Sequence, residues 1–289
     1  MSLSFRFLTL LSCLAYCVLC AVLAAFCLRA KVRVLLNRTP DGTAQPPPEQ
    51  PTQGGRLPLS LASCAALAAF LAIPPGSLPA LLPFSWGAFA VLGCLALASG
   101  LAGAWSWNGA TQRQTRVLAF LALSLALFAW YGQQRGAPGE IFSLDWYVTT
   151  PLANLMGWGE GFGMLLLALA LLLALRDVQQ DLASSLARAT RLEPDEARLA
   201  VASALVRQIW ILAVLGMTVC LFVPFSPAGR LGMSGVTGTA VDALWFWLKI
   251  LIADHALWLG GMRLPQLSLC RPWGQMLIAG FGALCLLFA

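Results

Sequence analysis

The 289-residue chain has few groups that could carry out chemistry. It contains one histidine, and only 10% of its residues are charged. A single histidine cannot form a bis-histidine haem site or a histidine-rich metal site, and no Walker loop, nucleophile elbow or HExxH sequence is present. We therefore expect no catalytic residues, no metal site and no cofactor in this chain. The cysteines fall mostly in apolar segments, where we expect them to pack as small hydrophobic side chains.

What the sequence has in excess is apolar residues, at 59% of all positions and with a mean hydropathy of +0.78. Both values lie outside the range of soluble domains. A helix needs about 20 apolar residues to cross a bilayer core. The sequence predicts an all-α, polytopic membrane protein, with residues 1–289 as a single membrane domain. Its eight predicted spans are residues 7–28, 58–75, 84–105, 117–132, 153–175, 199–224, 240–260 and 273–289.

Basic residues are distributed unevenly between the two sides that eight spans define. Thirteen lysines and arginines fall in one set of connections, 29–57, 106–116, 176–198 and 261–272, and only three fall on the other side. The positive-inside rule places the basic connections in the cytoplasm and both termini on the outer, periplasmic side. The net charge of +6 is then a property of topology, so we expect no binding to nucleic acid.

Two of the predicted cytoplasmic loops differ in character. Residues 29–57 are rich in proline and glutamine, which predicts a flexible loop. Residues 176–198 carry five acids and four arginines, with a helical piece predicted from Asp177 to Thr190. Pro194, followed by two acidic residues, is typical of the first turn of a helix. The plain interpretation of these acids is helix capping.

The ionisable residues inside predicted spans that most need an explanation are Arg207, Lys249 and Asp254. Each costs about 2.5–3.5 kcal/mol on insertion scales, so such residues are usually paired, hydrated or functional. Lys249 follows Asp242 by seven residues and shares its helix face, which suits a row of water-linked groups. The alternatives are snorkelling to the membrane surface and a structural ion pair between helices.

The order of features along the chain resembles a known family. The matching segments are Arg207-Gln208, LFVPFSP (Leu221 to Pro227), Lys249, MRLPQLSLCRP (Met262 to Pro272) and SGLAGAWSWNGATQRQ (Ser99 to Gln114). They are similar to the integral membrane subunit that formate hydrogenlyase (its subunit 4), hydrogenase-4 (its component C) and NADH-quinone oxidoreductase (subunit 1 of complex I) have in common. Asp181 matches the family's acidic signature, but Ser184, Ser185-Leu186 and Ala102 stand where the family has acids.

The resemblance implies a divergent, non-catalytic subunit of an energy-converting hydrogenase-like or complex I-like assembly in the bacterial inner membrane. It implies that nickel-iron and iron-sulfur centres belong to partner subunits. The implied partners are hydrogenase-like large and small subunits, antiporter-like membrane subunits and the lipid bilayer. The alternatives are a small multi-pass transporter of an ion or solute, and a structural anchor that has lost proton coupling.

Two sets of functional candidates follow. For a proton path they are Lys249, Asp242, Arg207, Asp254, His255, Asp181 and Glu193. For docking of a peripheral arm they are Arg33, Arg38, Arg113, Arg188, Arg191 and Arg263.

Overall fold

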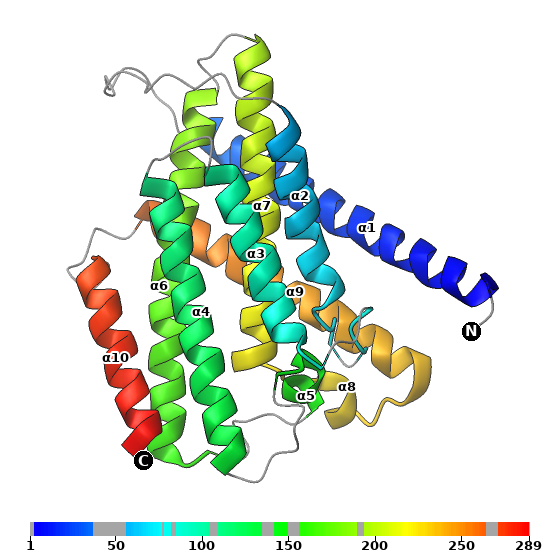
Figure 1. Cartoon of the computed structure of the whole chain (residues 1–289), viewed down its shortest axis with the longest axis vertical. Coiled ribbons are helices and arrows are strands. Elements are labelled where there is room, and N and C mark those ends of the chain that lie inside the picture. The colour runs from blue at the N-terminus through cyan, green and yellow to red at the C-terminus, as the bar shows by residue number, and fades with distance from the viewer. Residues whose placement is uncertain are drawn as a thin grey trace.

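In the computed structural model, the part of the chain that is described is helical and contains no strand (Figure 1). This part comprises residues 3–36, 56–76, 78–81, 85–103, 109–134, 142–149, 156–189, 194–263 and 271–288. Its helices are α1 (Leu3–Leu36), α2 (Arg56–Leu71), α3 (Gly87–Gly103), α4 (Gly109–Gln134), α5 (Leu144–Thr149), α6 (Trp158–Ala189), α7 (Pro194–Phe222), α8 (Pro227–Arg230), α9 (Gly235–Arg263) and α10 (Pro272–Phe288).

Each of the eight predicted spans overlaps an apolar helix, which confirms the all-α class of the described residues. Five of them, α1, α4, α6, α7 and α9, are long and apolar enough to cross a membrane. α2, α3 and α10 are shorter apolar helices of 16, 17 and 17 residues. The chain therefore has the character of a multi-pass membrane protein, while the count of eight spans stays a prediction.

The helices form an upright bundle crossed by two oblique helices (Figure 1). α2, α4, α7 and α10 run in one direction along the long axis, and α3 and α6 run in the other. α1 and α9 cross this bundle at an angle, and the N-terminal half of α1 extends beyond it. The rings of Tyr16 on α1 and Trp247 on α9 lie 6.2 Å apart, so the two oblique helices also contact each other.

α7 is the centre of the bundle. The most apolar window of this helix is 78% buried inside the protein, against 22% for α1 and for α9. Its neighbours are α1, α2, α3, α5, α6 and α9. Trp210 of α7 is buried, and its indole N–H donates to the carbonyl oxygen of Leu95 on α3 at 3.1 Å. A helix that is hydrophobic all round is expected in such a central position.

The backbones of α6 and α10 approach each other closely at two glycines. A Cβ atom added to Gly163 would lie 2.7 Å from the carbonyl oxygen of Gly282, and one added to Gly282 would lie 2.9 Å from the carbonyl oxygen of Gly163. No side chain fits at either position without separating the backbones. Small residues that allow such close approach are typical of helix pairs in membranes.

Several predicted boundaries were wrong because helices continue past the apolar runs. α1 extends to Leu36, so the first eight residues of the predicted loop 29–57 are helical, and α2 already begins at Arg56. α6 joins the fifth predicted span to the predicted helical piece after Asp177 in one helix of 32 residues. In both cases a polar end gains support from neighbouring helices, which apolar length alone cannot predict. The first turn of α7, with Pro194, Asp195 and Glu196, is confirmed.

Candidate functional site

A fully buried ion pair connects four helices near one end of the bundle. The ammonium nitrogen of Lys31 on α1 lies 2.8 Å from Oδ1 of Asp254 on α9. It also donates to the side-chain oxygens of Gln179 on α6, at 2.9 Å, and of Gln208 on α7, at 2.7 Å. We call these four residues the Lys31 cluster. Lys31 is 1% exposed and Asp254 is 0% exposed, so neither charge reaches the surface by snorkelling.

The two glutamines complete the cluster by bonding to both charges. Their amide groups donate to Oδ1 of Asp254, at 2.6 Å from Gln179 and 3.2 Å from Gln208. The ring of Trp258, one turn after Asp254 on α9, lies 5.2 Å from the Lys31 ammonium and adds a cation–π contact. Buried charges are tolerated when they are paired and hydrogen-bonded in this way.

One polar atom of the cluster makes no hydrogen bond within the part of the chain that the structure describes. Oδ2 of Asp254 is buried and has no hydrogen-bond partner among the described residues. The indole nitrogen of Trp258 is likewise buried without an acceptor among these residues. An ionised carboxylate normally accepts several hydrogen bonds. Asp254 therefore has one oxygen that remains available to a further donor or cation.

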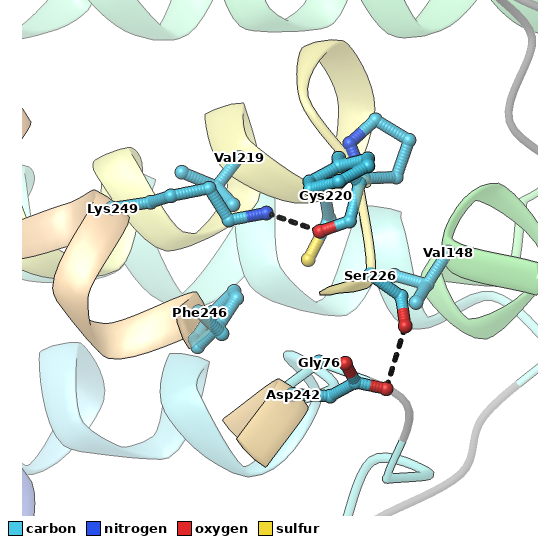
Figure 2. A pocket seen from close by; sticks show the side chains of 10 residues that line it. Gly76, Val148, Val219, Cys220, Ser226, Asp242, Phe246 and Lys249 are labelled. Carbon is cyan, nitrogen blue, oxygen red and sulfur yellow. Dashed lines mark hydrogen bonds between the residues drawn. The ribbon is translucent and has the colours of Figure 1, made fainter. Parts of the chain in front are cut away.

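A second polar group lies nearer the N-terminus of α9, about three turns before Asp254. Asp242 and Lys249 line a small pocket together with Gly76, Cys220, Phe225 and Ser226 (Figure 2). Oδ2 of Asp242 accepts from the Ser226 hydroxyl at 2.7 Å, and Oδ1 accepts from the Ala228 N–H at 3.0 Å. The structure thus brings Asp242 and Lys249 to one site, as their shared helix face predicts.

Lys249 bonds to backbone oxygens at the end of α7. Its ammonium donates to the carbonyl oxygens of Val223, at 2.7 Å, and Phe225, at 3.1 Å (Figure 2). A cation at the C-terminus of a helix is stabilised by the helix dipole and by carbonyls that have no partner within the helix. The contacts of Asp242 and Lys249 therefore also hold the connection between α7 and α8.

The two polar sites share one face of α9 but are separated by apolar side chains. The buried positions recur every four residues, with Phe246 and Ile250 between Asp242 and Asp254. Twelve residues of helix separate the two carboxylates along the axis, which corresponds to about 18 Å. A proton could pass between them only through water, because neither Phe246 nor Ile250 can bind one.

A third polar group joins α4, α6 and α10 near the end of α6. Arg113 forms an ion pair with Asp181, and Arg116 forms one with Asp177 at 3.4 Å. The amide of Gln275 on α10 donates to Asp177 at 2.9 Å and accepts from Arg116 at 3.2 Å. Asp177 and Asp181 are one turn apart, whereas Gln179 between them belongs to the Lys31 cluster. α6 therefore presents polar groups to two different partners.

The remaining predicted residues are dispersed. Arg207 bonds to the Ser185 hydroxyl at 3.4 Å, and Nδ1 of His255 contacts the carbonyl oxygen of Leu251 in its own helix at 3.0 Å. Arg33 is exposed in the last turn of α1. Arg188 and Arg263 lie at helix ends, but their side chains are outside what is described. Glu193, Arg38 and Arg191 lie outside the described residues altogether.

Lys31 was missed because the sequence analysis assigned it to a surface loop. The signal that could have found it is the stripe of cysteines on α1. Cys13, Cys20 and Cys27 share a helix face, and Lys31 falls on the same face. Cys20, Ala24, Cys27 and Lys31 are all buried. Neither glutamine was a site candidate, because a neutral amide in an apolar segment does not stand out by charge; Gln208 entered only through the resemblance at Arg207-Gln208.

The site contains no set of ligands for a transition metal. The eight cysteines in the described residues are free thiols, including Cys17 and Cys20, which are spaced as a CxxC pair. No group of three or more histidine, cysteine, aspartate or glutamate side chains that could hold a metal ion occurs within the described ranges. The charged groups of this part of the protein can hold or transfer protons or simple cations.

Comparison with models of known protein families gave no match, and comparison with curated proteins gave none either. The fold and the site define the class of this protein. It is a helical, multi-pass membrane protein with a buried lysine–aspartate pair.

Proposed function

We propose that the chain is the membrane-embedded subunit of an energy-converting hydrogenase-like complex, related to formate hydrogenlyase and complex I. In this role it anchors a peripheral redox arm and conducts protons. The observation that carries the proposal is the Lys31 cluster. Four helices contribute charged or amide side chains to one buried point. Burying charges in a membrane protein costs free energy, and an inert anchor has no need of such a site.

The polar groups suggest an order for proton transfer. Asp181 and its neighbours lie toward the C-terminal end of α6, the Lys31 cluster lies beside them through Gln179 of the same helix, and Asp242 with Lys249 lies toward the N-terminal end of α9. The path begins at the predicted cytoplasmic end and reaches the outer side through water beside Phe246 and Ile250. Arg207 and His255 border this route.

The peripheral arm docks on the predicted cytoplasmic end of the bundle. Arg33 is exposed there at the end of α1, and the Arg113 side chain, although paired with Asp181, remains 39% exposed. Basic side chains favour an acidic partner surface. The other docking candidates are Arg38, Arg188, Arg191 and Arg263. The nickel-iron and iron-sulfur centres belong to the large and small subunits of the partner.

Two other functions each have one observation in their favour. A structural anchor without proton coupling is favoured by the contacts of Asp242 and Lys249, which hold the α7–α8 connection. A small ion transporter is favoured by the buried Oδ2 of Asp254, which accepts no hydrogen bond from the described residues.

Purification in mild detergent tests the proposal. We expect a tagged chain to recover a nickel-iron large subunit or its metal-free relative, together with antiporter-like membrane subunits. Recovery of the chain alone, in a state that still unfolds cooperatively, would contradict it.

Proton pumping by the assembled complex then separates conduction from anchoring. We expect Asp254→Asn to abolish pumping and Lys249→Ala to reduce it, with Arg198→Ala as the control, because Arg198 pairs with Asp195 on an exposed turn. Normal pumping by the first two variants in an intact complex would leave the chain as an anchor.

A further inference from the structure

The Lys31 ammonium is surrounded in the way that a bound cation would be. Three oxygen atoms from three different helices lie 2.7–2.9 Å from its nitrogen, and the face of Trp258 covers it from a further direction. Hard cations prefer carboxylate and amide oxygens of this kind as ligands. The protein has therefore built an oxygen-lined cation site, which Lys31 occupies.

The cluster holds one more oxygen than Lys31 uses. Oδ2 of Asp254 is buried and accepts no hydrogen bond from the described residues. With Oδ1 and the side-chain oxygens of Gln179 and Gln208, it makes four oxygens in one place. A metal ion needs several oxygen ligands, whereas an ammonium group has only three N–H donors to satisfy.

The charge of the cluster sets the valence of the ion. Among the described residues, the titratable groups that interact with Lys31 are Asp254 of α9 and the Cys27 thiol of α1, while α6 and α7 contribute the neutral Gln179 and Gln208. One carboxylate balances one positive charge. A divalent ion would leave an uncompensated charge in the apolar interior.

We propose that the Lys31 cluster is an exchange site, in which an alkali-metal cation replaces the proton on Lys31. The ammonium of Lys31 loses one proton to solvent and becomes a neutral amine. The cation then binds the Asp254 carboxylate and the oxygens of Gln179 and Gln208. One positive charge leaves and one enters, so the buried site remains neutral in both states.

This exchange goes beyond the proposed function, because it needs no partner subunit and links proton release to binding of a second ion. It gives Lys31 a task distinct from that of Lys249. The ammonium of Lys249 bonds to two backbone carbonyls at the end of α7, which carry no net charge to balance a metal ion in its place.

Proton release on addition of salt tests the exchange directly. The purified full-length chain in detergent and weak buffer receives sodium, potassium or lithium chloride, or choline chloride at the same ionic strength. The pH is followed with an indicator dye over about pH 6 to 10, a range that approaches the usual pKa of lysine. We expect up to one proton released per chain with at least one alkali-metal ion, and none with choline.

Variants assign the effect to the cluster. Lys31→Met should still gain thermal stability when the alkali-metal salt is added, because Asp254 still binds the cation. Lys31→Met combined with Asp254→Asn should show neither response. Arg198→Met is the control, since it also replaces one basic residue by methionine but at an exposed pair outside the cluster, and it should release protons as the unchanged protein does.

The proposal is overturned if the unchanged protein releases no more protons with alkali-metal salts than with choline. It is also overturned if Asp254→Asn releases protons normally. If Lys31→Met does not fold, proton release by the wild-type protein and by Asp254→Asn still decides whether the exchange occurs. Neither result depends on which proteins co-purify with the chain.

Discussion

At the scale of single residues, the charges in the apolar helices differ in what they hold together. Lys31 and Asp254 are fully buried and join helices that are distant in sequence. Asp242 and Lys249 bind backbone groups of the neighbouring α7–α8 connection. Asp195 and Arg198 form an exposed pair within one turn of α7. Burial decides how much each pair should matter, because exposed pairs contribute little and broken buried pairs are costly.

Removing one member of the buried pair should be more harmful than removing both. We expect Lys31→Met or Asp254→Leu alone to destabilise the protein by about 3–5 kcal/mol, because each leaves an uncompensated buried charge. The double variant should recover most of that loss. Unfolding in detergent, followed by circular dichroism, measures it, and Arg198→Ala should leave stability unchanged. Simple addition of the two single effects would contradict the pairing.

The two hydrogen bonds that Asp242 accepts from Ser226 and Ala228 should each contribute to stability, so that removing both should cost more than removing one. Asp242→Leu removes the acceptor of both the Ser226 hydroxyl and the Ala228 N–H. We expect a loss of about 1–3 kcal/mol for the buried N–H left unsatisfied. Ser226→Ala removes only one of the bonds and should cost less. Limited proteolysis of the α7–α8 connection compares the two. Equal sensitivity of both variants would argue against the anchoring contacts.

At the scale of elements, continuous helices place the polar groups. α6 runs without interruption from Trp158 to Ala189, so the acids that a loop would have left in water are held against α4. α1 continues to Leu36 and thereby turns Lys31 inward. Helix stability in proteins comes mainly from tertiary packing, which explains why both helices extend into polar sequence.

The glycine crossing of α6 and α10 makes a prediction with an internal control. Gly282→Val should separate the two helices, because its Cβ would overlap the backbone of Gly163. Gly280→Val should be tolerated, since a Cβ there has nothing within 4 Å. Both changes lie on α10 and add the same side chain. The thermal midpoint in detergent should fall only for Gly282→Val, and equal shifts would contradict the close contact.

At the scale of the whole molecule, the packing of α1 and α9 across the upright helices brings distant parts of the sequence together. Residues 31 and 254 are 223 positions apart and yet form a direct ion pair at 2.8 Å. Most of the apolar window of α1 lies outside the protein interior, where exposed residues such as Leu14 and Phe26 suit lipid or a neighbouring membrane subunit.

The predicted topology can be tested independently of function. If eight helices span the membrane, both termini lie on the outer side and the connections after α1, α3, α6 and α9 lie in the cytoplasm. A phosphatase reporter fused to the C-terminus should be active, while a fluorescent reporter fused after α3 should fluoresce inside the cell. An inactive phosphatase at the C-terminus would reduce the number of spans by one or reverse the orientation.

The sequence by itself determined that the described part of the chain is helical, roughly where its apolar helices lie, and how α7 begins. Long apolar runs and Pro194 carry that information locally, because a helix satisfies its own backbone groups. Only the tertiary structure decided that Lys31 is buried, that Asp254 is its partner, and that Gln179 and Gln208 complete the site. Residue periodicity tells which face of a helix is buried, but the helix that covers this face is chosen by packing over the whole chain.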